Sequence, residues 1–134
     1  MDRATRNLVF ILRSLAAVTS LALVPVFMPH AWMDQCHRLL GLGPLVETPM
    51  IAYLTRTLSG MYALHAAVLW LAAYDVRRYA PLVMLLGCWL TFSGPVLVGI
   101  DLYARLPLAW VLGEGPVVTV LGLAILVLQR KLPR

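Results

Sequence analysis

The chain has 134 residues, of which 61% are hydrophobic and only 13% are charged, and its mean hydropathy is +0.84. Soluble domains contain about 45–50% apolar and about 25% charged residues, and a domain of this length has too little interior to bury such an excess of apolar surface. The composition therefore excludes a water-soluble monomer and predicts a membrane protein. The length predicts a single membrane domain, residues 1–134, without a separate soluble catalytic module.

The formal net charge is +5, but the basic residues form short clusters between apolar segments. That distribution is typical of membrane topology and argues against nucleic-acid binding. Cys36 lies between two apolar segments and Cys88 lies inside one, so we expect no disulfide framework. Arg3 and Arg6 precede the first apolar segment as in a signal peptide, but no small-x-small cleavage pattern follows it. We therefore expect a retained first helix.

Four segments have the roughly 20 mostly apolar residues that are needed to cross a bilayer. They cover residues 7–28, 50–74, 80–100 and 108–128. Pro25 and Pro95 should kink the first and third of these helices, because proline removes an internal hydrogen bond. The expected fold is all-α: a polytopic membrane protein built as a four-transmembrane-helix bundle.

The segment between the first two spans has helical periodicity of its own. Its apolar residues predict a short interfacial amphipathic helix over residues 30–40, ended by the sequence Gly41-Leu42-Gly43-Pro44. His30, Asp34 and His37 lie on one face of this helix, at a spacing that metal ligands can use. Asp34 also lies four residues before Arg38, as in an ordinary helix ion pair, so a solvated face is the simpler interpretation. We predict no metal and no other cofactor.

The basic residues are distributed unequally between the two sides of the predicted spans. Eight of the 11 Lys and Arg residues lie on the side of the termini, and three, Arg38, Arg56 and Arg105, lie on the other side. The positive-inside rule then places both termini in the cytoplasm, as expected for a protein of the bacterial cytoplasmic (inner) membrane.

Small residues recur at helical spacing in the second, third and fourth spans. They are Ser59, Ala63 and Ala67, then Gly87, Thr91 and Gly94, and finally Gly115, Thr119 and Gly122. Membrane helices associate through close backbone approach at such residues. The pattern favours a compact bundle, and the same faces could join copies of the chain in a homo-oligomer.

Ionisable residues inside a span are costly and mark candidate sites. Arg56 and Glu114 each lie about six residues, roughly 9 Å, inside the outer end of their spans, and Asp101 closes the third span on that side. An Arg56–Glu114 or Arg56–Asp101 pair would let opposite charges share one desolvated site. Such a pair could fix the helix register, or the residues could form an outward-facing site for an anion, a substrate or protons.

His65 lies near the middle of the second span, one turn from Tyr62. A histidine there could ligate haem iron, relay protons or contact a quinone. No second histidine lies at a matching depth for bis-histidine haem ligation, so the simpler interpretation is a histidine hydrogen-bonded to Tyr62 or to a neighbouring helix.

Recognisable catalytic motifs are absent from the sequence. It contains no Cys-x-x-Cys, Gly-x-Ser-x-Gly, His-Glu-x-x-His or Walker sequence, which argues against an enzyme. The first span also lacks the mid-membrane carboxylate on which small four-helix multidrug exporters depend, which argues against that family.

Two stretches carry a resemblance to known proteins. From Tyr53 the sequence reads Tyr-Leu-Thr-Arg-Thr-Leu-Ser-Gly-Met-Tyr-Ala-Leu-His, later followed by Asp-Val-Arg-Arg-Tyr, and Glu-Gly-Pro occupies residues 114–116. These stretches resemble small uncharacterised bacterial four-span membrane proteins over about half of the chain. The resemblance implies a four-span fold and a membrane location, and it supplies no activity.

Three functional hypotheses follow from the sequence. The leading one is a non-enzymatic accessory or scaffolding component, whose partners are the lipid bilayer and a homo-oligomer or larger membrane complex. The second is a carrier or channel for a small anionic or protonated solute that uses Arg56, Glu114 and Asp101, with His65 deeper on the route. The third is a haem- or quinone-linked redox subunit that uses His65 and Tyr62.

Overall fold

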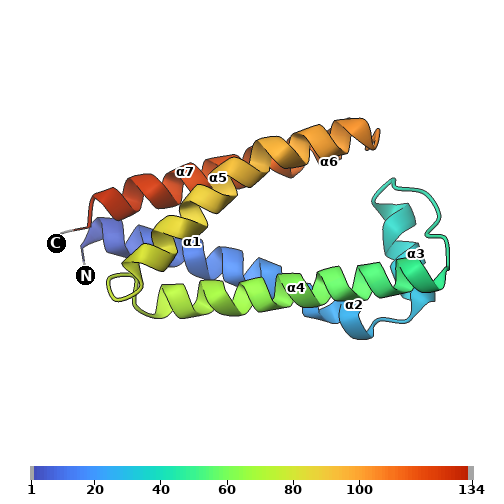
Figure 1. The fold of residues 1–134 in the computed structure, drawn as a ribbon, viewed down its shortest axis with the longest axis horizontal. Helices are drawn as coiled ribbons and strands as arrows, with labels where there is room; N and C mark the ends of the chain where they lie inside the picture. Colours follow the sequence, from blue (N-terminus) through green and yellow to red (C-terminus); the bar gives the residue numbers. More distant parts are fainter. Residues whose placement is uncertain (1, 133–134) are drawn as a thin grey trace. The chain divides into compact units, whose positions relative to one another are not determined.

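The computed structural model describes residues 2–132, which form helices joined by turns and by one longer irregular segment, residues 40–48, and contain no strand (Figure 1). The helices are α1 (Arg3–Ser20), α2 (Leu23–Phe27), α3 (His30–Leu39), α4 (Pro49–Tyr74), α5 (Ala80–Tyr103), α6 (Leu108–Gly113) and α7 (Gly115–Arg130). Four segments are long and apolar enough to cross a membrane: Arg3–Phe27, Pro49–Tyr74, Ala80–Tyr103 and Leu108–Arg130. The predicted all-α fold of a multi-pass membrane protein with four spans is confirmed.

The chain divides into two compact units. Unit 1 comprises Met1–Ser14 and Trp70–Arg134, and unit 2 comprises Leu15–Leu69. Unit 1 therefore holds the start of α1, the end of α4 and all of α5, α6 and α7. Unit 2 holds the end of α1, then α2 and α3, and most of α4. The single membrane domain stays a prediction.

The first span is broken where Pro25 requires it. α1 ends at Ser20 and α2 begins at Leu23, so the break includes Leu21, four residues before the proline. A proline ring clashes with the carbonyl of that residue and has no N–H to donate to it. The predicted kink at Pro25 is confirmed as an interruption of the helix, whereas α5 runs continuously through Pro95.

Two helices end in the same Schellman geometry with different residues at the left-handed position. After α3, Gly41 has φ 75°, and the amide of Leu42 donates to the His37 carbonyl over 3.1 Å. After α5, Arg105 has φ 56°, and the amide of Leu106 donates to the Asp101 carbonyl over 3.0 Å. Glycine adopts this conformation without steric cost, whereas an arginine loses roughly 1 kcal/mol there.

Replacing Arg105 with glycine should therefore stabilise the protein. We expect Arg105→Gly to raise the free energy of unfolding by up to about 1 kcal/mol, and Gly41→Ala at the equivalent position after α3 to lower it by about the same amount. Denaturant titration in detergent micelles measures both. A stability of Arg105→Gly equal to or below that of the wild type would show that Arg105 contributes more through its side chain than its backbone conformation costs.

The small residues predicted in the third and fourth spans bring α5 and α7 into backbone contact within unit 1. A Cβ atom added at Gly94 would lie 2.5 Å from the carbonyl oxygen of Gly115, and one added at Gly122 would lie 2.8 Å from that of Gly87. Real Cβ atoms do not approach so closely, so each of these positions accepts only glycine without a shift of the backbone. These glycines therefore lie on the face through which the third and fourth spans pack against each other.

Threonines occupy the positions between these glycines. Thr91 and Thr119 turn their hydroxyls back to the carbonyls of Gly87 and Gly115 in their own helices, over 2.8 and 3.0 Å. This bond satisfies the hydroxyl inside its own helix, and the hydroxyl oxygens of Thr119 and Thr91 lie next to Gly94 and Gly122 of the opposite helix. In the second span, a Cβ at Gly60 would meet nothing within 4 Å and Ala67 is exposed, so neither residue lies at a comparable contact.

A matched pair of glycines in α5 tests this contact. A Cβ at Gly99 would meet nothing within 4 Å, so Gly99→Ala should leave stability unchanged or raise it by up to about 1 kcal/mol through helix propensity. Gly94→Ala should lower the free energy of unfolding by about 1–3 kcal/mol, because α7 must move away from the added methyl group. Unfolding of both variants in the same micelles gives the comparison, and equal stabilities would refute the close approach.

Candidate functional site

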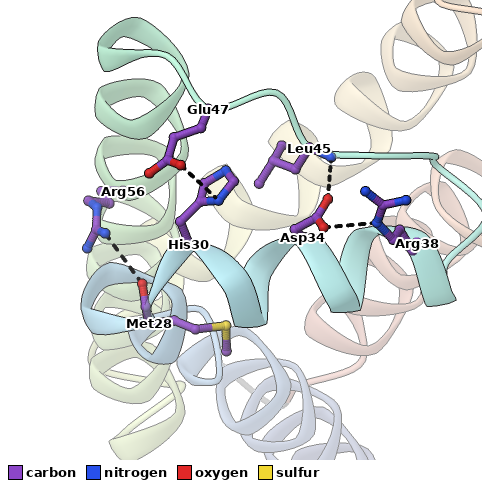
Figure 2. A network of polar contacts seen from close by, with 7 residues as sticks. All are labelled: Met28, His30, Asp34, Arg38, Leu45, Glu47 and Arg56. Atoms are coloured by element: carbon purple, nitrogen blue, oxygen red, sulfur yellow. Dashed lines mark hydrogen bonds and ion pairs between the residues drawn. The ribbon is translucent and has the colours of Figure 1, made fainter.

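Unit 2 contains a network of polar contacts formed by α2, α3, α4 and the segment between α3 and α4 (Figure 2). The side chains of this polar network are Arg56, His30, Asp34, His37, Arg38 and Glu47. They include one of the charged residues that the sequence singled out, Arg56, and all three of the weak metal-ligand candidates.

Arg56 caps the end of α2. Its Nη1 donates to the Val26 carbonyl over 2.8 Å. Its Nη2 lies 3.4 Å from the Met28 carbonyl (Figure 2). The last carbonyls of a helix have no partner inside the helix and carry the negative end of its dipole, so a guanidinium satisfies both requirements at once. A cation within the second span is thus tied to the end of the first.

The segment that follows α3 folds back on the helix through three side chains. Asp34 accepts hydrogen bonds from the Leu45 amide over 2.7 Å and from Arg38 Nε over 2.9 Å. His37 Nδ1 lies 2.9 Å from the Gly43 carbonyl oxygen, and His30 Nδ1 lies 3.7 Å from a carboxylate oxygen of Glu47. These contacts fix the path of the chain from α3 to α4.

The hydrogen bond from Arg38, followed by the one from the Leu45 amide, holds the pKa of Asp34 below its ordinary value. Asp34 is therefore ionised at neutral pH and works as a charged acceptor, the form that makes the stronger hydrogen bonds.

The three weak metal-ligand candidates do not converge. His30 faces Glu47, Asp34 faces Arg38 and Leu45, and His37 faces Gly43. Within residues 2–132 no group of three or more His, Cys, Asp or Glu side chains could hold a metal ion. Their helical spacing instead lets all three side chains contact the segment that connects α3 to α4.

Glu114 lies in unit 1, at a break in the fourth span. α6 ends at Gly113 and α7 begins at Gly115, and Pro116 accounts for the interruption because it cannot donate to the preceding turn. Glu114 Oε2 accepts a hydrogen bond of 2.7 Å from Trp110 Nε1. This half-buried carboxyl group therefore joins the two parts of the broken span.

Asp101 is the most deeply buried ionisable residue among those that the sequence singled out. Only 3% of it is exposed, and its Oδ2 atom has no hydrogen-bond partner among the described residues. It lies on α5 seven residues beyond Gly94, so it extends the face that α5 turns to α7. Its main-chain carbonyl accepts the Leu106 amide at the end of the helix.

The predicted pairs of Arg56 with Glu114 or Asp101 stay predictions, because Arg56 belongs to unit 2 and the two acids belong to unit 1. The structure gives each of two residues a hydrogen-bond partner within its own unit. Arg56 binds carbonyls at the end of α2, and Glu114 binds the Trp110 indole.

Tyr62 and His65 both lie on α4 in unit 2. Tyr62 is 51% exposed and His65 is half-buried. The expected hydrogen bond between them is not formed in the described part of unit 2, and His65 has no polar contact there with any neighbouring helix. The pair therefore gives no geometric support to the predicted redox site.

The capping of α2 by Arg56 and the break at Glu114 were not predicted from the sequence. Pro116 is a signal for the break, just as Pro25 is for the one in the first span. No residue type signals the cap, because the acceptors are main-chain carbonyls.

Comparisons with protein-family models, with curated proteins and with solved structures found no match for this chain. The function is therefore inferred from the geometry of the chain itself.

Removing the guanidinium of Arg56 should destabilise unit 2. We expect Arg56→Gln to lower the free energy of unfolding by about 1.5–3 kcal/mol, the range for hydrogen bonds that involve a charged group, and Arg56→Lys to lower it less. Arg38→Gln is the matched control, because the Arg38 side chain is 59% exposed and a surface pair contributes at most about 1 kcal/mol. Unfolding titrations in micelles would contradict the capping role if the Arg56→Gln and Arg38→Gln variants were equally stable.

Proposed function

We propose that the protein is a non-enzymatic accessory or scaffolding component of an assembly in the bacterial cytoplasmic membrane, with both termini in the cytoplasm. The observation that carries the proposal is that its polar side chains make contacts that hold the fold together. Arg56 caps a helix, Glu114 joins the halves of a span, and Asp34 and His37 hold the segment that returns from α3 to α4. These are structural roles, and they leave few groups for chemistry.

The apolar surface supports the same proposal. On α5, a row of large side chains lies on a face other than the one that contacts α7: Leu85, Trp89, Phe92 and Val96, with exposed fractions of 64, 59, 69 and 45%. Such surface is stable only against lipid or against another apolar protein surface. The chain has many such side chains and little extramembrane structure among its described residues. Both features are expected of a protein that acts by binding other membrane proteins.

The orientation rests on the unequal distribution of Lys and Arg between the two sides of the spans. The carrier and redox hypotheses stay predictions.

Purification of the full chain at its native expression level tests the proposal. We expect a protein tagged at the C-terminus and extracted in mild detergent to bring down a reproducible membrane partner or further copies of itself. The tag should be accessible only from the cytoplasmic face. Gly94→Ala, which disturbs the contact of α5 with α7, should lose part of the associated material, and Gly99→Ala should retain it.

Reproducible isolation of the wild type as a monomer with no partner would contradict the proposal. A tagged, unrelated four-span protein from the same membranes identifies material that binds non-specifically, and only partners absent from that control count in favour of an assembly.

A further inference from the structure

Three segments that are distant in the sequence bring basic side chains to one end of unit 1. The start of α1, the turn between α4 and α5, and the end of α7 lie at this end (Figure 1). The exposed basic residues there, called the basic end of unit 1, are Arg3, Arg6, Arg77, Arg78, Arg130 and Lys131.

Contacts between these segments support the arrangement in the figure. The pKa of Asp2 is lowered mainly by a hydrogen bond from the Thr5 side chain and to a small extent by the charge of Arg77 in the turn, which agrees with the placement of the start of α1 at this end (Figure 1). The side-chain amide of Gln129, at the end of α7, donates to the Ala80 carbonyl at the start of α5. The basic end is thus assembled by the fold of unit 1.

The turn between α4 and α5 carries two of these basic side chains, those of Arg77 and Arg78. Asp75 Oδ1 accepts the backbone amides of Arg77 and Arg78 over 3.1 and 3.0 Å, so this carboxylate is engaged with the main chain. The Arg78 guanidinium carbon lies 5.7 Å from the centre of the Tyr79 ring, within the range of a cation–π contact. Both arginine side chains remain exposed.

Two carboxylates, Asp2 and Asp75, also lie at this end of unit 1, and the six basic side chains outnumber them. Within its described residues no carboxylate forms an ion pair with any of the six basic side chains, whereas in unit 2 Arg38 is paired with Asp34 over 2.9 Å. All six also lie within about one turn of the end of a membrane-length helix. In a bilayer that position is the depth of the lipid phosphates.

We propose that the basic end of unit 1 binds the headgroups of anionic phospholipids, of which phosphatidylglycerol is the simplest, in the leaflet that this end reaches. The arrangement favours a lipid over a soluble anion, because the cations surround the ends of the spans. Polybasic segments next to a span attract anionic lipids through the same electrostatics. The proposal does not depend on an accessory role and adds a lipid requirement to whatever the protein does.

Titration of the purified full chain with lipid tests the proposal. Native mass spectrometry of the protein in neutral detergent counts bound lipid as phosphatidylglycerol or phosphatidylcholine is added. We expect phosphatidylglycerol to bind more tightly, with an affinity that falls as salt is raised. The double variant Arg77→Gln with Arg78→Gln should weaken its binding by about fivefold for each charge removed at low salt.

The matched control is Arg38→Gln with Arg105→Gln, which removes the same charge from exposed positions outside the basic end and should leave phosphatidylglycerol binding unchanged. If the turn variant does not fold, Arg130→Gln with Lys131→Gln tests the same end from α7. Equal binding of the two lipids, equal loss in control and test variants, or displacement of the lipid by millimolar inorganic phosphate would overturn the proposal.

Discussion

The close approach of α5 and α7 is the constraint on which the rest of unit 1 depends. Inside a bilayer the hydrophobic effect does not drive helices together, because lipid tails are as apolar as leucine, and association relies on packing and on interhelical polar contacts. Gly94, Gly115 and Gly122 remove the side chains that would hold the backbones apart. The contact also determines which face of α5 remains for lipid or partners, the one with Trp89 and Phe92, and it brings the start of α5 to the end of α7, where Gln129 bonds to Ala80.

Unit 2 is held together differently, through helix ends rather than helix faces. Pro25 breaks the first span, and the short α2 that results ends in carbonyls without partners inside the helix. Exposed to hydrocarbon, such groups would each cost several kcal/mol. Arg56 satisfies two of them from α4, so the half-buried arginine lowers the cost of the broken helix. The arginine that stood out in the sequence as a candidate site is explained by a proline 31 residues earlier.

The features predicted correctly from sequence are those with a signal in residue type. Apolar length gave four spans, Pro25 located a break, Gly41 located the end of α3, and small residues located the faces of α5 and α7. The features that were missed depend on the main chain or on residues in unexpected roles. Arg56 binds carbonyls that every residue possesses, and Arg105 occupies a left-handed position that normally indicates glycine. The small residues of the second span stay a prediction, because small side chains permit close approach without determining which surface approaches them.

The central claim is that α5 and α7 touch backbone to backbone, and solid-state NMR of the labelled protein in lipid bilayers measures this most directly. Through-space carbon correlations should join the Cα region of Gly94 to that of Gly115, and the Cα region of Gly87 to that of Gly122. If these cross-peaks are absent from spectra in which sequential contacts within α5 and α7 are resolved, then the helices do not meet at their glycines and the account of unit 1 is wrong.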